Sequence, residues 1–160
     1  MSAEREPIRL FVTAPLAAGA EVVLGREQTH YLRNVMRRTA GDTLGMFNGS
    51  DGEWRAVLRE VGKHSCAVEV REQIQPQWRN PDLWLLFAPV KRARTELIIE
   101  KAVELGVREI HPVLTEYTHA PTLNLDRLAA IAIEAAEQCG LVSVPNIAAP
   151  EKLETLLDSW

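Results

Sequence analysis

Three cations follow an apolar run in the second half of the chain. Residues 83–90 (LWLLFAPV) are almost continuously apolar, which is typical of a strand covered on both faces. Lys91, Arg92 and Arg94 come directly after it, where a helix is predicted to begin. In open α/β sheets, ligands bind beyond the carboxyl ends of the strands, and a helix start adds free N–H groups and partial positive charge. This pattern indicates a site for an anion, most simply a phosphate.

The same cations allow a simpler interpretation. The predicted helix also carries Glu96, Glu100 and Glu104, and charge runs beside helices commonly form a solvated, ion-paired face. From spacing alone, the anion site and the ion-paired face both stay open.

A second basic cluster lies on a short helix predicted over residues 26–38, where apolar side chains recur at helical spacing. Its arginines are Arg26, Arg33, Arg37 and Arg38. Arg33 and Arg37 are four residues apart and share a face, and His30 and Tyr31 are available to stack on bases. Two arginine-rich patches could hold one folded RNA. A helix that is charged only for solubility is the alternative.

Other kinds of site find little support in the sequence. The four histidines show no metal-ligand spacing, and Cys66 and Cys139 fit no zinc or redox motif. No phosphate-binding glycine loop or Ser-His-Asp arrangement is visible. The segment EAAEQC puts Glu134 and Gln138 on an alanine-rich helix that can approach a neighbour closely, which suits packing or a contact with a subunit or substrate.

Composition favours an ordinary globular protein of the cytoplasm. The 160 residues are 46% hydrophobic and 25% charged, with a net charge of −4. The apolar runs are shorter than the roughly 20 residues needed to cross a bilayer, and the N-terminus is charged where a signal peptide would be apolar. The acidic total argues mildly against non-specific nucleic-acid binding, but local clusters decide such binding.

The two halves of the chain differ in their secondary-structure pattern. In the first half, short apolar segments separated by Gly, Asp and Asn turns predict a small β-barrel or sandwich, with Cys66, Val68 and Val70 on the inward side of one strand. The second half alternates strand and helix, which predicts a parallel sheet with right-handed crossovers. Its expected strands and helices are residues 83–90, 94–105, 107–115, 124–140, 142–147 and 149–159.

Several segments resemble the bacterial ribosomal RNA small subunit methyltransferase E family. They are PIRLFV, HYLRNVMRR, Gly41-Asp42, MFNGSDGEW, APVKRARTELIIEKAVELGVREIHPVLTE and IEAAEQCGLVSVP. The resemblance implies an α+β two-domain fold: a PUA-like RNA-binding β-barrel (1–73), a linker (74–81) and the first part of a SPOUT-class α/β domain with a parallel sheet (82–160). The trefoil knot of that domain would follow Trp160, so the chain is expected to be truncated at its C-terminus.

The resemblance also implies a function. Family members use S-adenosylmethionine to methylate N3 of a uridine in 16S rRNA of the small ribosomal subunit, as homodimers and without a metal or a membrane. Lys91 and Arg94 are the expected catalytic cations, because a positive charge near the base would stabilise a uracil anion. The expected RNA-binding residues are Arg9, Arg33, Arg37, Arg38 and Arg92. Glu116, Glu134 and Gln138 are expected in the active-site shell or at an interface.

Two departures and one absence qualify this resemblance. Tyr117 stands where a basic residue is expected, and Leu141 where an arginine often follows. The glycine-rich cofactor loops would lie after Trp160, so the 160 residues alone are expected to bind S-adenosylmethionine poorly and to be inactive. A noncatalytic RNA-binding module is therefore the alternative function, and a small nucleotide-binding α/β protein is disfavoured because no phosphate loop is visible.

Overall fold

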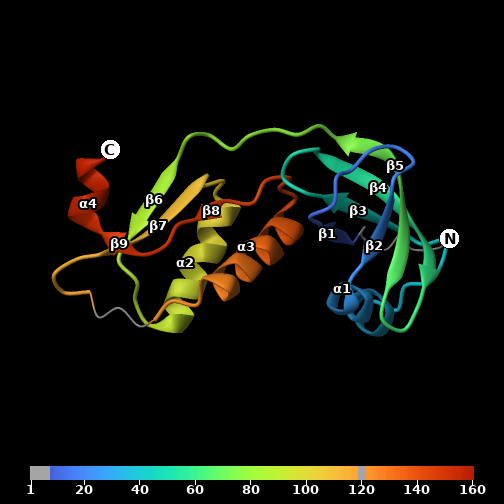
Figure 1. Cartoon of the computed structure of the whole chain (residues 1–160), viewed down its shortest axis with the longest axis horizontal. Helices are drawn as coiled ribbons and strands as arrows, with labels where there is room; N and C mark the ends of the chain where they lie inside the picture. The colour runs from blue at the N-terminus through green and yellow to red at the C-terminus, as the bar shows by residue number, and fades with distance from the viewer. Residues whose placement is uncertain (1–7, 119–121) are drawn as a thin grey trace. The chain divides into compact units, whose positions relative to one another are not determined.

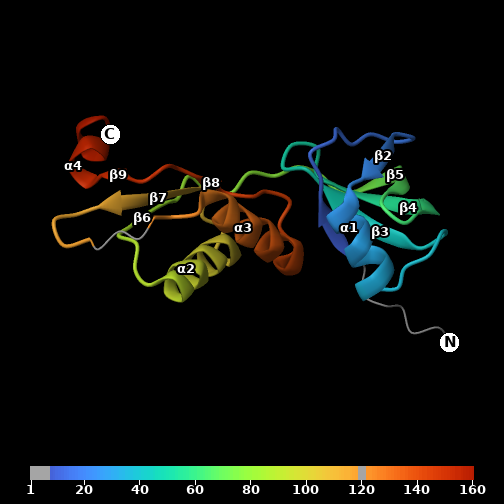
Figure 2. The same ribbon diagram turned by 60° about the horizontal axis from the view of Figure 1, so that its bottom comes forward.

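The computed structural model describes residues 8–118 and 122–160. The chain forms two compact units, unit 1 up to Trp78 and unit 2 from Arg79, and each is described by itself. The helices and strands of both are labelled in Figure 1 and seen from a second direction in Figure 2.

Unit 1 is built on one five-stranded sheet, which confirms the predicted β character of the first half. The strands lie in the order β1-β3-β4-β5-β2; β1 runs parallel to β3, and the other neighbours are antiparallel. Three irregularities in the β4–β5 register bend the sheet around its core, as bulges do. The strands are β1 (Arg9–Phe11), β2 (Glu21–Leu24), β3 (Thr43–Phe47), β4 (Glu53–Val61) and β5 (Cys66–Gln75).

The core of unit 1 follows the alternation seen in the sequence. Cys66, Val68 and Val70 are each 1% exposed or less, as their spacing predicted, and they belong to one core cluster with Leu44 of β3 and Leu58 of β4. Because successive strand residues point to opposite faces, this one buried face sets the register of β5 against its neighbours.

The helix predicted over residues 26–38 is divided into two parts. An α-helical turn, α1 (Arg26–His30), passes directly into a π-helix, η1 (Tyr31–Val35), in which the Met36 N–H donates to the carbonyl of Tyr31 at 2.9 Å. Arg37 then adopts a left-handed backbone with φ 51°, which ends the helix. The predicted helix is thus confirmed as far as Val35, but its second part is π-helical and it ends three residues before the predicted boundary.

A buried ion pair joins β1 to β4. Arg9 donates to both carboxylate oxygens of Glu53 at 2.9 Å, and the two side chains are only 11% and 8% exposed. The guanidinium also lies 4.7 Å from the centre of the Phe47 ring. Gly45, between them on β3, leaves the space that the carboxylate occupies, because a Cβ there would collide with Glu53 Oε1.

Unit 2 contains the predicted parallel sheet. The central strand β7 pairs in parallel with β6 along one edge and with the short strands β8 and β9, one after the other, along the other. The helices α2 and α3 lie side by side on one face of this sheet, and α4 lies away from them (Figures 1 and 2). The elements are β6 (Trp84–Phe87), α2 (Arg92–Glu104), β7 (Glu109–Leu114), α3 (Leu125–Cys139), β8 (Asn146–Ile147), β9 (Glu151–Lys152) and α4 (Leu153–Asp158).

The last third of unit 2 differs from its prediction. The strand expected at 142–147 is reduced to the two residues of β8, and the start of the helix expected at 149–159 is replaced by β9. Pro145 stands directly before β8 and has no N–H to donate to a neighbouring strand.

Helical spacing over residues 94–105 predicts Leu97, Ile98, Ala102 and Leu105 on the buried side of α2, and the structure confirms Ala102 among them. Thr95, Ile99 and Val103 are buried, whereas Leu97 is 51% and Leu105 77% exposed. Apolar residues occur on more than one side of this helix, so helical periodicity could not decide which side meets the sheet.

Candidate functional site

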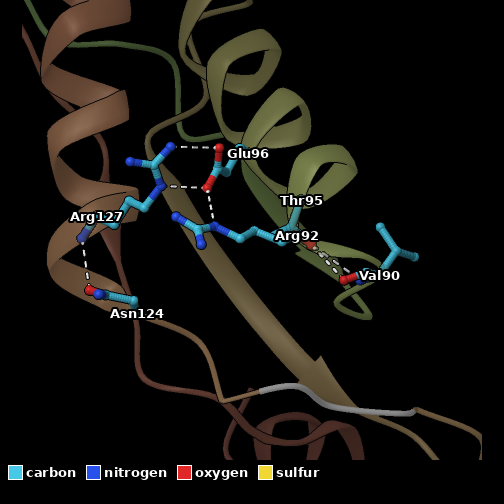
Figure 3. A network of polar contacts seen from close by, with 6 residues as sticks. All are labelled: Val90, Arg92, Thr95, Glu96, Asn124 and Arg127. Carbon is cyan, nitrogen blue, oxygen red and sulfur yellow. Dashed lines mark hydrogen bonds and ion pairs between the residues drawn. The ribbon is translucent and has the colours of Figure 1, made fainter.

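The carboxyl edge of the unit 2 sheet is shaped by a short connection between β6 and α2. Lys91 is the N-cap of α2, and its carbonyl accepts hydrogen bonds from the N–H groups of Arg94 (2.9 Å) and Thr95 (3.1 Å). The Thr95 hydroxyl donates to the carbonyl of Val90 at 3.1 Å and accepts from its N–H at 3.2 Å. Thr95 is 2% exposed, so this reciprocal pair holds the loop against the helix (Figure 3). Lys91 is thereby fixed beyond the end of β6.

Glu96 connects the first turns of α2 and α3. Its carboxylate accepts from Arg92 Nε at 2.9 Å and, through both oxygens, from Arg127, whose Nη2 lies 2.9 Å from Oε2 (Figure 3). The Arg127 guanidinium, followed by that of Arg92, lowers the pKa of Glu96 from its ordinary 4.5 to about 2. Asn124 caps α3 by accepting from the N–H of Arg127 at 3.0 Å. Glu96 is therefore ionised throughout the neutral range and orients both arginines.

The residues of this network line a small cavity of about 180 Å³ between the starts of α2 and α3. The lining side chains include Val90, Arg92, Thr95, Glu96, Asn124 and Arg127. Two guanidinium groups share one carboxylate here, so the cavity keeps an excess positive charge. An anionic group of modest size is the ligand that such a lining would favour.

The three predicted cations are in different states. Arg92 is ion-paired with Glu96 four residues later, which matches the ion-paired interpretation of this run. Lys91 and Arg94 are exposed and form no ion pair within residues 8–118 and 122–160. These two are therefore the cations at this edge that can meet a ligand without first breaking a salt bridge.

The acidic and amide candidates are distributed over the unit. Glu116 is exposed and follows β7, at the same sheet edge as Lys91, because β6 and β7 are parallel. Glu134 and Gln138 are exposed on α3, but Gln138 is eleven positions beyond Arg127, which is about 16 Å along the axis. The structure does not bring Gln138 to the cations.

Arg9, one of the expected RNA-binding residues, is engaged in the buried ion pair with Glu53. Arg33 and its neighbours are differently placed: Arg33, Arg37 and Arg38 line one side of an open cavity of about 420 Å³, together with Thr39 and Val61. Arg33 also donates to the carbonyl of Gly62 at 3.2 Å. The left-handed Arg37 and the π-helical turn before it set where these arginines project.

Sequence reasoning missed Arg127 and the cap at Asn124. The signal was present, because the helix predicted from residue 124 follows a parallel strand and must begin at the same sheet edge as α2. A basic residue in its first turn thus had to lie near the cations that follow β6. Within the described residues, no group of three or more His, Cys, Asp or Glu side chains could hold a metal ion. No described helix is long and apolar enough to cross a membrane.

Comparison with protein families gives two matches. Residues 78–160, more than half of the chain, match the family described as RNA methyltransferase domain. Residues 24–71 match the RNA methyltransferase PUA domain.

Two curated relatives carry the same name. The Ribosomal RNA small subunit methyltransferase E of Rickettsia conorii is 32% identical over 151 residues, which are 94% of this chain and 61% of that protein. That of Synechocystis is 37% identical over 145 residues, 89% of this chain and 47% of that protein. The chain therefore spans between about half and two thirds of the length of these relatives.

Two solved structures share the fold. The Ribosomal RNA small subunit methyltransferase E from Neisseria gonorrhoeae, bound to S-adenosyl methionine, superposes with a TM-score of 0.89 at 25% identity, covering 97% of this chain and 66% of that one. A methyltransferase from Legionella pneumophila with bound S-adenosyl methionine gives 0.86 and 25%, covering 98% and 67%. These matches confirm the expected fold class, a PUA-like domain followed by a SPOUT-class α/β domain. The chain belongs to the RNA methyltransferase family whose curated relatives are named Ribosomal RNA small subunit methyltransferase E.

Proposed function

We propose that this chain supplies the RNA-binding part and the target-base edge of an enzyme that methylates N3 of a uridine in 16S rRNA. Lys91 and Arg94, exposed and without an ion pair among the described residues at the carboxyl edge of the sheet, carry this proposal. The family membership and the names of the relatives support the reaction class.

The chemistry required at this edge is stabilisation of an anion. Methylation at N3 replaces an N–H by an N–CH₃, so the ring must lose a proton, which passes to solvent, and negative charge develops on the uracil. A cation held near the ring lowers the free energy of that anion, and a preformed charge does so without reorganisation. In this proposal Lys91 and Arg94 provide the charge, and the Glu96 network keeps the first turns of α2 and α3 in place around it.

The small cavity between the starts of α2 and α3 does not fit S-adenosylmethionine. The cavity at the sheet edge is about 180 Å³, below the roughly 300 Å³ at which small-molecule sites begin, and its two arginines would repel a sulfonium cation. Two described glycines of unit 2 have positive φ, Gly106 and Gly140. Each follows the end of a helix, α2 or α3, so they do not come together in one cofactor-binding loop. We therefore propose that the methyl donor is held outside this cavity, and that the enzyme is a homodimer, which sedimentation analysis would test.

The decisive experiment is methyl transfer from labelled S-adenosylmethionine to small ribosomal subunits, followed by nucleoside digestion. The product of the whole gene is compared with its Lys91→Ala variant, and the 160-residue chain is assayed beside them. We expect label in N3-methyluridine with the gene product and a loss of ~10²-fold in Lys91→Ala, the usual size for one electrostatic donor.

Arg108→Ala is the matched control for this assay. It also removes one exposed positive charge, but at the amino end of β7, where Arg108 pairs with Asp82. Equal rates for Lys91→Ala and the unaltered protein would refute the role of Lys91. RNA binding without label from either protein would favour the alternative, a noncatalytic RNA-binding module.

A further inference from the structure

A second basic surface lies where the helix of unit 1 meets the turn between β4 and β5. We call it the hairpin cleft; it is an open cavity of about 410 Å³. Its lining side chains are Arg26, His30, Arg33, Asn34, Lys63 and His64. The first four come from α1 and η1, and the last two from the turn, so the cleft has two walls. No acidic side chain lines it.

The two walls are tied together by hydrogen bonds. Arg33 Nη1 donates across the cleft to the carbonyl of Gly62 at 3.2 Å, and the N–H of Gly62 donates to the carbonyl of Ser65 at 2.9 Å, which closes the turn. A Cβ on Gly62 would lie 2.8 Å from that Ser65 oxygen, so the tight turn depends on glycine here. Lys63 and His64 are therefore presented on a defined loop opposite the helix.

The polar groups on the helix wall are oriented as well. The side-chain amide of Asn34 donates to His30 Nδ1 at 2.7 Å, so in the neutral imidazole the proton is on Nε2, which can donate to a ligand. Arg26, His30 and Arg33 follow one another at spacings of four and three residues and share one side of the helix. The wall thus offers N–H donors and positive charge, and few acceptors.

The cations of this cleft differ from the arginines on the sheet of unit 1. On the sheet, Arg55 pairs with Glu72, and Arg59 and Arg71 pair with Glu69. Among the described residues, Arg26 and Lys63 form no ion pair, although both are exposed. The surface charges of the sheet are thus neutralised within the protein, whereas those of the cleft are left for an external anion.

We propose that the hairpin cleft binds phosphates of the RNA backbone and reads no base. This inference rests on the proposed function in taking RNA as the partner. It adds Lys63 and His64, for which neither the sequence nor the family match indicated a contact, to the basic cluster that contains Arg26. Donors and positive charge recognise phosphate oxygens, whereas base recognition needs a pattern of donors and acceptors. Arg33 also lines the neighbouring cavity with Arg37 and Arg38, so one strand could continue from one cavity into the other.

The test is the salt dependence of RNA binding by the 160-residue chain. Fluorescence anisotropy with a short labelled single-stranded RNA gives log K against log salt concentration, and each lost phosphate contact flattens the slope by about 0.7. We expect that change for Lys63→Ala and for Arg26→Ala, with the same loss of affinity for a second RNA of permuted sequence. Lys63→Arg keeps the charge and should keep the slope.

Arg55→Ala is the matched control, because it removes one exposed arginine from the same unit, about 20 Å back along β4 from the turn. The proposal is overturned if Lys63→Ala leaves the slope unchanged, or if Arg55→Ala flattens it by the same amount. It is also overturned if the unaltered chain binds neither RNA. This test does not measure methyl transfer. If the cleft variants bind RNA like the unaltered chain, the proposed reaction is unaffected, and if methyl transfer is not found, the RNA-binding result is unaffected.

Discussion

Removing one partner of the Arg9–Glu53 ion pair is expected to destabilise unit 1 strongly. In Glu53→Ala the Arg9 guanidinium stays in a site where its side chain is only 11% exposed, without its carboxylate. Stranding one charge of a buried pair costs ~3–5 kcal/mol. We expect about 3 kcal/mol, the lower end, because the cation keeps its contact with the Phe47 ring at 4.7 Å. With a urea m-value of ~1–3 kcal/mol/M, the midpoint of unfolding should fall by about 1–3 M.

Urea unfolding followed by far-UV circular dichroism measures this loss. Arg55→Ala is the control, because its pair with Glu72 is 53% and 61% exposed and should contribute less than about 1 kcal/mol. The reasoning is refuted if Glu53→Ala and Arg55→Ala shift the midpoint equally. Replacing both partners, Arg9→Met with Glu53→Leu, should recover most of the stability, since neither charge of this pair then loses its counter-ion. RNA affinity of that double variant would show separately whether Arg9 contacts RNA.

Two further predictions concern the sheet edge of unit 2. Glu96 has a folded-state pKa of about 2 against an ordinary 4.5, so its network stabilises the fold above pH 4.5 and is lost as the pH falls towards 2. The urea midpoint of Glu96→Gln should therefore lie below that of the unaltered chain at neutral pH and converge with it on acidification; a constant gap would contradict this. Thr95→Val removes both hydrogen bonds to Val90 and should cost ~1–3 kcal/mol, because each such bond contributes ~0.5–1.5 kcal/mol. Thr95→Ser, which keeps the hydroxyl, should unfold close to the unaltered chain, and equal losses in the two variants would exclude the hydrogen bonds as the cause.

Local pattern predicted the elements better than the contacts between them. The alternation of Cys66, Val68 and Val70 sufficed to find the buried face of β5, because a strand has only two faces. It could not orient α2, where Leu97, Ile98 and Ile99 are consecutive and point in three directions around the helix. The choice was made by packing against the sheet and α3.

The candidate sites show the same division. The position of Lys91 at the end of a strand followed from the order of elements, since the apolar run and the helix start are adjacent in the sequence. The pairing of Glu96 with Arg127, 31 positions later, and the pairing of Arg9 with Glu53, 44 positions later, depend on tertiary structure. The π-helical turn at Tyr31–Val35 was likewise invisible, because it accompanies the full burial of Leu32 and the bond from Arg33 to Gly62.

The absence of a side chain at Gly45 also constrains how this family of sequences can vary. The Cβ of any larger residue there would overlap the Glu53 carboxylate, which would have to move away from Arg9. Positions 9, 45 and 53 should therefore change together among homologues: a chain with alanine at 45 is expected to carry a shorter or uncharged residue at 53, and an uncharged one at 9. In an alignment this would appear as a three-way covariation between residues on three different strands. The covariation of the arginine would then reflect packing inside the β domain and not a contact with RNA.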